Sequence, residues 1–157
     1  MILYHHTNHR VLPVIRREGL TVGRIVLDEN RQVAAISLTS SPTLEGLGLN
    51  LEDEPLTEAD RVNIYRLTGF LPPAGAKFGA NATMRITVSI PEFDARLVHW
   101  RDYHERVEPK RLRAMEEGER PGTWWVYLGQ IPPAWFTAIH HRQGTEYVED
   151  QGSARAE

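Results

Sequence analysis

The chain contains no cysteine, which excludes disulfide bridges, thiolate zinc sites, iron–sulfur clusters and a cysteine nucleophile. It also has no apolar run close to the roughly 18 residues that a transmembrane helix requires. The first residues turn polar after Tyr4, so they lack the basic segment and long apolar stretch of a secretory signal. Together these absences predict a cytoplasmic protein without a membrane partner.

Positive charge is in the minority, because 18 Lys and Arg face 21 Asp and Glu and leave a formal net charge of -3. That balance argues against a nucleic-acid coat protein or a polybasic membrane binder. It still permits an enzyme that touches nucleic acid through one local groove. At 157 residues the chain is long enough for one domain with its own core, which we expect over residues 1–150, followed by a frayed polar tail over 151–157.

Alternation of apolar and polar residues is clearest over residues 83–90, where Met84, Ile86, Val88 and Ile90 form one face of a predicted strand. Other strands are expected at the start of the chain and over 33–38, 124–128, 135–139 and 147–148. Helices are expected over 11–18, 94–104 and 109–117. This order predicts an α+β domain with a mostly antiparallel sheet and a few peripheral helices.

Residues 41–82 have little periodicity and are rich in glycine and proline. Only residues 60–67 have the composition of a short strand or helix. A long stretch of this kind is typical of a binding loop or a lid, and the alternative is a flexible insertion without a binding role.

The segment Tyr4-His5-His6-Thr7 ends the first predicted strand, and Ile15 and Gly19-Leu20 follow it across the first predicted helix. Two successive histidines on a strand point to opposite faces, so only one of them can enter a given cleft. The segment and its spacing resemble the opening motif of the ADP-ribosyltransferase superfamily, which includes RNA 2′-phosphotransferases. The resemblance implies a split, mostly antiparallel sheet of the ADP-ribosyltransferase type with NAD bound in a cleft.

The same resemblance assigns roles to the residues of this segment. His5 takes the place of the family histidine that hydrogen-bonds the ribose of NAD, and Thr7 takes the place near the nicotinamide amide. Tyr4 belongs to the same binding motif. His6 stands where the family usually has glycine, a departure that crowds the approach to the ligand.

The family's next strand ends in an aromatic or small polar residue that lines the nicotinamide pocket. Thr39 and Ser40 take that place here, without the tyrosine that many members have. An aromatic surface for nicotinamide must then come from elsewhere, and Trp124, Trp125 and Tyr65 are the candidates.

A third likeness lies in residues 124–133 and 135–139, which resemble the penultimate strand, proline turn and final strand of the superfamily. Polymerase-like members carry a catalytic glutamate near the start of that penultimate strand. The matching positions, Thr123 and Trp124, are not acidic. We therefore expect Glu119, in the turn before the strand, to be the catalytic carboxylate, with Glu146 as its competitor.

Cleavage of the bond between nicotinamide and ribose builds positive charge on the sugar, which a nearby carboxylate stabilises. The pyrophosphate of NAD suits bidentate binding by arginine, and Arg24 and Arg85 are the candidates. A metal centre is not expected, because the histidines near the start of the chain point to different faces.

These expectations favour an NAD-dependent ADP-ribosyltransferase that modifies an unidentified macromolecule, protein or nucleic acid, and releases nicotinamide. A toxin or phage effector is among the biological roles such an enzyme would have. The alternatives are an RNA 2′-phosphotransferase-like enzyme, or a non-catalytic NAD- or nucleotide-binding module of the same fold.

Overall fold

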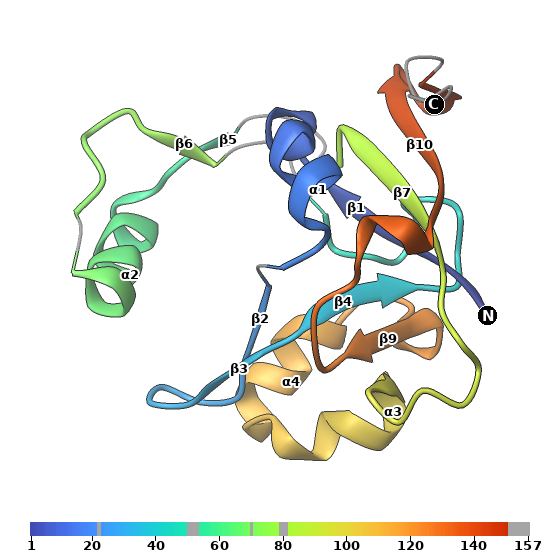
Figure 1. The fold of residues 1–157 in the computed structure, drawn as a ribbon. Coiled ribbons are helices and arrows are strands. Elements are labelled where there is room, and N and C mark those ends of the chain that lie inside the picture. Colours follow the sequence, from blue (N-terminus) through green and yellow to red (C-terminus); the bar gives the residue numbers. More distant parts are fainter. Residues whose placement is uncertain (22, 50–53, 70, 79–81, 151–157) are drawn as a thin grey trace.

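The computed structural model describes residues 1–21, 23–49, 54–69, 71–78 and 82–150 (Figure 1). Its centre is a seven-stranded sheet in the order β11-β10-β7-β1-β4-β9-β8, and every pair of neighbours is antiparallel. The strands are β1 (Ile2–Thr7), β4 (Ile36–Thr39), β7 (Met84–Ser89), β8 (Leu97–His99), β9 (Trp124–Tyr127), β10 (Phe136–Gln143) and β11 (Glu146–Glu149).

Two small two-stranded ladders lie outside this sheet. One joins β2 (Arg24–Val26) to β3 (Gln32–Ala34), and the other joins β5 (Glu54–Pro55) to β6 (Lys77–Phe78). The helices are short: α1 (Leu12–Glu18), α2 (Glu58–Thr68), α3 (Trp100–Tyr103) and α4 (Pro109–Glu116). In the described ranges, no helix has both the length and the apolar character needed to cross a membrane.

The α+β architecture and the antiparallel sheet confirm the prediction from the sequence. The expected strand over 33–38 is instead divided, because β3 pairs with β2 whereas β4 pairs with β9. The expected helix over 94–104 is also wrong in its first half, where β8 pairs with β9 and helix begins only at Trp100. The short element expected over 60–67 is the helix α2, which begins with a capping box between Thr57 and Asp60. The tail over 151–157 lies outside the described residues.

The sheet has a hydrophobic core on each face. On one face, Leu3 and Ile86 of the sheet pack with Leu12 and Ile15 of α1. On the other face, Val126 of β9 belongs to a second cluster. Its other members lie in β2, directly after β3, and in and after α3: Ile25, Ala35, Trp100, Tyr103 and Val107. Burial on both faces fixes the strand register, because a slip by one residue would move every side chain of a strand to the opposite face of the sheet.

The junction between β1 and β4 has fewer register pairs than any other junction in the seven-stranded sheet. These strands share the single register pair Tyr4↔Thr39, whereas β1 and β7 share six pairs. A side chain adds a further link, because Nδ1 of His5 lies 2.9 Å from the carbonyl oxygen of Ser37 in β4. The histidine side chain therefore adds a hydrogen bond to a junction that has one register pair.

Residues 54–69 and 71–78 belong to the connection between β4 and β7 and extend away from the seven-stranded sheet, with α2 well away from it (Figure 1). Local contacts hold this arm together: Nε of Arg61 donates to the carbonyl of Pro72, and the amide of Leu56 donates to the carbonyl of Ala76. Part of the region expected to be irregular is thus a separate helical arm.

Candidate functional site

A cleft of about 610 Å³ opens beside the junction of β1 and β4. Its walls come from the strands β1, β2, β4 and β9, the helices α3 and α4, the loop after β4 and the turn after α4, so residues far apart in the sequence face a common space. The lining includes Tyr4, His5 and His6 of β1, Arg24 of β2, Ser37 and Thr39 of β4, the loop residues Leu47, Gly48 and Leu49, Arg111 and Met115 of α4, Glu119, and Trp124 of β9. Cavities of this size accommodate small-molecule ligands.

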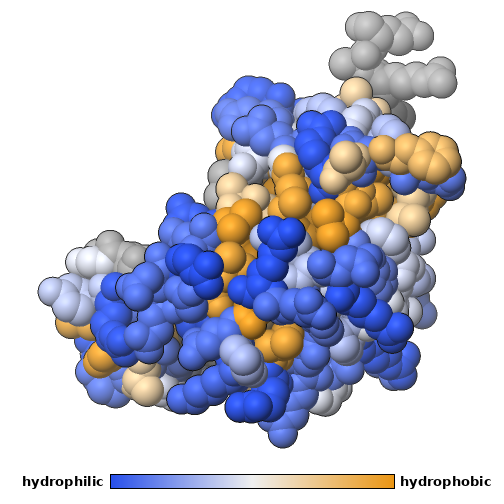
Figure 2. Space-filling view, turned by 90° about the horizontal axis from the view of Figure 1, so that it is seen from below, coloured by the Kyte–Doolittle hydropathy of each residue, from blue (hydrophilic) through white to orange (hydrophobic). Residues whose placement is uncertain are grey.

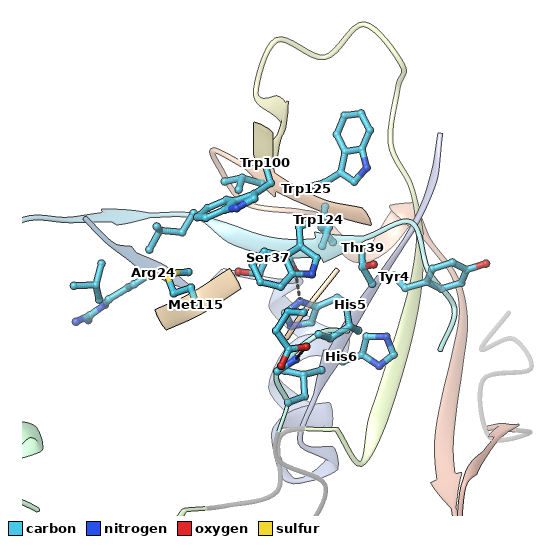
Figure 3. Close-up of a pocket in the computed structure, with 18 of the residues that line it drawn as sticks. Tyr4, His5, His6, Arg24, Ser37, Thr39, Trp100, Met115, Trp124 and Trp125 are labelled. Carbon is cyan, nitrogen blue, oxygen red and sulfur yellow. Dashed lines mark hydrogen bonds between the residues drawn. The ribbon is translucent and has the colours of Figure 1, made fainter. Parts of the chain in front are cut away.

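The geometry of His5 determines which of its nitrogens carries a proton. A carbonyl oxygen only accepts hydrogen bonds, so the contact to Ser37 requires a hydrogen on Nδ1. Burial lowers the pKa of the His5 ring below its usual value, although the hydrogen bond to Ser37 opposes this in part. At neutral pH the ring is therefore neutral, and Nε2 is a hydrogen-bond acceptor. Figure 3 shows the ring turned toward Ser37, whereas Tyr4 projects to the other side.

Trp124 gives the cleft an aromatic surface next to the polar side chain of Thr39, its cross-strand partner. Its indole Nε1 donates to the carbonyl oxygen of Gly46 at 3.1 Å, which fixes the ring. Trp124 also packs on Trp100, with ring centroids 5.8 Å apart. A fixed aromatic ring of this kind suits stacking against a flat heterocycle.

Two arginines line the cleft, one from a strand and one from a helix. Arg24 belongs to β2 and is exposed, and Arg111 lies on the face of α4 that also carries Met115. Nε of Arg111 is buried, and no hydrogen-bond partner reaches it from the described residues. A buried guanidinium donor without a partner is costly unless a ligand or water satisfies it.

Glu119 brings a carboxylate to the same cleft from the turn before β9. Its Oε2 accepts a hydrogen bond of 3.0 Å from the backbone amide of Gly48. The acid is half-buried and lies against the loop that forms one wall of the cleft.

Of the residues predicted from the sequence, the cleft brings together Tyr4, His5, Arg24, Thr39, Glu119 and Trp124. Thr7, Ser40 and Arg85 are not among its lining residues. Thr7 ends β1 opposite Met84, and the amide of Ser40 donates to the carbonyl of Thr123.

Arg85 has a structural environment of its own. Its guanidinium lies over the rings of Tyr4 and Tyr147, at 5.2 and 4.8 Å from their centroids. It also donates to the carbonyl oxygen of Pro42 at 2.6 Å. These contacts tie the start of the loop after β4 to the sheet.

The alternative residues lie in different places. Trp125 lines the cleft, whereas Tyr65 lies on α2 in the arm. Glu146 is exposed at the start of β11, paired with Gln143, and is not a lining residue. The described ranges contain no cluster of three or more metal-ligating side chains.

Sequence reasoning missed Arg111, Met115 and the wall formed by Leu47 and Leu49. Arg111 occurs in a helix with other basic residues, Lys110 and Arg113, and nothing in the sequence distinguishes it from a solvated charge. The periodicity of α4 identifies a helix, but only its packing shows which face meets the cleft.

The surface seen from below carries hydrophobic side chains gathered between hydrophilic ones (Figure 2). Contiguous apolar surface with polar rims is typical of ligand and partner sites. Comparisons with protein family models, curated proteins and solved structures gave no match.

Proposed function

We propose that this protein is an NAD-dependent ADP-ribosyltransferase, which transfers ADP-ribose to a macromolecular acceptor and releases nicotinamide. The observation that supports it is the cleft at the single-pair junction of β1 and β4, where His5, Trp124, Arg24 and Glu119 meet from separate segments. In this proposal the junction of β1 and β4, with its single register pair, corresponds to the split in an ADP-ribosyltransferase-type sheet.

The reaction breaks the bond between C1′ of the ribose and the nicotinamide nitrogen. Nicotinamide leaves with the bonding electron pair, and positive charge develops on the sugar. Glu119 stabilises that charge from its position in the cleft wall. The acceptor then forms a bond to C1′ through its nucleophilic atom and releases its proton to solvent.

The remaining side chains bind and orient NAD. The free Nε2 of His5 accepts a hydrogen bond from a ribose hydroxyl, because its Nδ1 hydrogen is engaged by Ser37. The ring of Trp124 stacks on a base of the dinucleotide. Arg24 and Arg111 bind the pyrophosphate, which supplies the acceptor oxygens that buried Nε of Arg111 lacks.

An RNA 2′-phosphotransferase-like activity is the second candidate. The pair of arginines in the cleft favours it, since that reaction requires cations for a 2′-phosphate as well as for NAD. The formal charge of -3 weighs against a long RNA-binding surface, so we rank it second.

NAD titration by calorimetry tests the proposal. The wild-type protein should bind NAD, and His5→Ala should weaken binding at least about tenfold because the ribose loses its acceptor. His9→Ala is the matched control, since His9 is exposed and lies outside the cleft lining. Absence of binding by the wild type at millimolar NAD would overturn the proposal.

Product analysis separates the candidates. Incubation with NAD should yield free nicotinamide and an acceptor carrying ADP-ribose, detected by mass spectrometry. Removal of a 2′-phosphate from a short RNA would instead support the second candidate. Binding of NAD without nicotinamide release would identify a non-catalytic module.

A further inference from the structure

We propose that the loop from Glu45 to Leu49 positions the carboxylate of Glu119, with the backbone amide of Gly48 as the group that holds it. The inference rests on the proposed function, because it assigns a positioning role within that site. It concerns how an acid that lies outside β9 is fixed in the cleft.

The contact between Glu119 and Gly48 leaves half of the carboxylate available. Oε2 accepts the Gly48 amide hydrogen bond at 3.0 Å. No hydrogen bond from the described residues reaches Oε1, although this oxygen lies close to Gly48. One oxygen therefore fixes the orientation of the carboxylate and the other remains for a ligand.

The loop is itself fastened to the segment that carries Glu119. The carbonyl oxygen of Gly46 accepts from the amide of Arg120 at 2.9 Å and from Nε1 of Trp124 at 3.1 Å. The side chain of Arg120 also pairs with Glu45. Several hydrogen bonds thus join the loop to the segment that carries Glu119, and each links residues more than 70 positions apart in the sequence.

Glycine is required for this close approach. Gly46 has φ 76°, and a Cβ added there would lie 2.5 Å from the side chain of Arg120. Gly48 also has a positive φ, at 62°. The docking of the loop against the turn before β9 therefore requires glycine at position 46, whereas at position 48 the positive φ favours glycine.

The loop also faces the ligand space. Leu47 and Leu49 line the cleft on either side of Gly48, so a ligand that fills the cleft contacts the same loop that holds Glu119. A carboxylate on a turn would otherwise sample several rotamers. Displacements of about 1 Å at a reacting group cost roughly 10²-fold in rate, so the loop has a direct effect on turnover.

Gly46→Ala tests this role without changing a lining side chain, because Gly46 is not in the cleft lining. Its added Cβ should push the loop away from Arg120. In the ligand-free protein we expect the Gly48 amide to exchange with solvent at least about tenfold faster. At saturating NAD we expect kcat for nicotinamide release to fall at least about tenfold.

Gly69→Ala is the matched control. Gly69 has φ 73°, so alanine is strained there in the same way, but nothing lies within 4 Å of the added Cβ. Gly48 exchange and kcat should both remain at wild-type values in this variant. Backbone strain alone is thereby separated from displacement of the loop.

Two changes at Glu119 give a second measurement should Gly46→Ala fail to fold. The amide oxygen of Glu119→Gln can still accept from Gly48, so exchange at Gly48 should stay within a few-fold, whereas Glu119→Ala should accelerate it at least about tenfold. Unchanged Gly48 exchange in Glu119→Ala would overturn the inference, as would faster exchange in Gly46→Ala with unchanged kcat. A wild type that releases no nicotinamide would overturn the proposed function and the catalytic role of the loop, while the exchange data would still show whether the contact exists.

Discussion

His6 donates a hydrogen bond from Nδ1 to the hydroxyl oxygen of Tyr147, at 3.0 Å, and so joins β1 to β11 across 141 positions of the sequence. The direction follows from the partner of Tyr147, because its hydroxyl hydrogen is donated to the carbonyl of Ala82 at 2.9 Å. Nε2 of His6 is then an unprotonated, buried nitrogen. The expectation that only one of the two histidines enters a given cleft is wrong, because both line it. Their hydrogen bonds differ: His5 contacts Ser37, whereas His6 contacts Tyr147 of the edge strand β11.

The stability of the protein should fall in mild acid because His6 is buried in its neutral form. Burial, with smaller contributions from His5 and Arg85, lowers the pKa of His6 from 6.5 to about 4. The unfolded chain therefore binds more protons between these values, and the free energy of unfolding decreases as pH falls from 6.5 toward 4, by up to about 1.4 kcal/mol per pH unit for each proton. His6→Gln should flatten this slope in urea denaturation at several pH values, and an equally steep slope in that variant would contradict the assignment.

Tyr147→Phe should destabilise the protein, although Tyr147 is not itself a lining residue of the cleft. The change removes a hydroxyl that makes two hydrogen bonds, each worth about 0.5–1.5 kcal/mol, and it leaves buried partners unsatisfied. We expect a loss of about 1–3 kcal/mol in the free energy of unfolding by urea denaturation. Tyr65→Phe, at an exposed tyrosine of α2, is the control and should change stability by less than about 0.5 kcal/mol.

Arg85 and Arg111 should have opposite effects, although the sequence favoured Arg85 as a ligand-binding residue. Arg85 lies between two tyrosine rings and bonds to Pro42, so Arg85→Met should lower stability by about 1–3 kcal/mol and leave NAD affinity within a few-fold. Arg111→Met should weaken NAD binding at least about tenfold with little change in stability. Calorimetry and urea denaturation of both variants measure these effects. The reverse pattern would assign pyrophosphate binding to Arg85 instead of Arg111.

The sequence predicted the strands whose side chains alternate, because their two faces have different environments. The strand expected over 83–90 is β7, whose buried Met84, Ile86 and Val88 alternate with more exposed residues. It did not predict β8, which is only Leu97–His99 and becomes a strand through pairing with β9. Short edge strands carry too few residues for a period to be visible, and their pairing partners are distant in the sequence.

Motifs and turns in the sequence pointed to some of the residues that line the cleft. His5 and Trp124 belong to motifs, and Glu119 was the nearest acid to a predicted strand; all three line the cleft. Arg111 and the loop from Glu45 to Leu49 reach the same space through tertiary packing alone. Arg85 has the residue type that a phosphate site requires, but its cross-strand neighbours are His6 and His140, so its surroundings depend on pairing that the local sequence does not encode.

The pH dependence of NAD binding provides a last test, because it depends on the same hydrogen atom that joins His5 to Ser37. With Nδ1 protonated, Nε2 accepts from a ribose hydroxyl only while the ring is neutral. Burial lowers the pKa of His5, so the neutral form should persist below pH 6.5, the midpoint expected for an ordinary histidine. Calorimetric affinity for NAD should accordingly stay constant from pH 8 to about 6.5 and decline only at lower pH, as protonation of Nε2 turns the acceptor into a donor. A decline centred at pH 6.5 or above in the wild type, absent from His5→Gln, would show that His5 titrates as an exposed ring and that the cleft binds its ligand in another way.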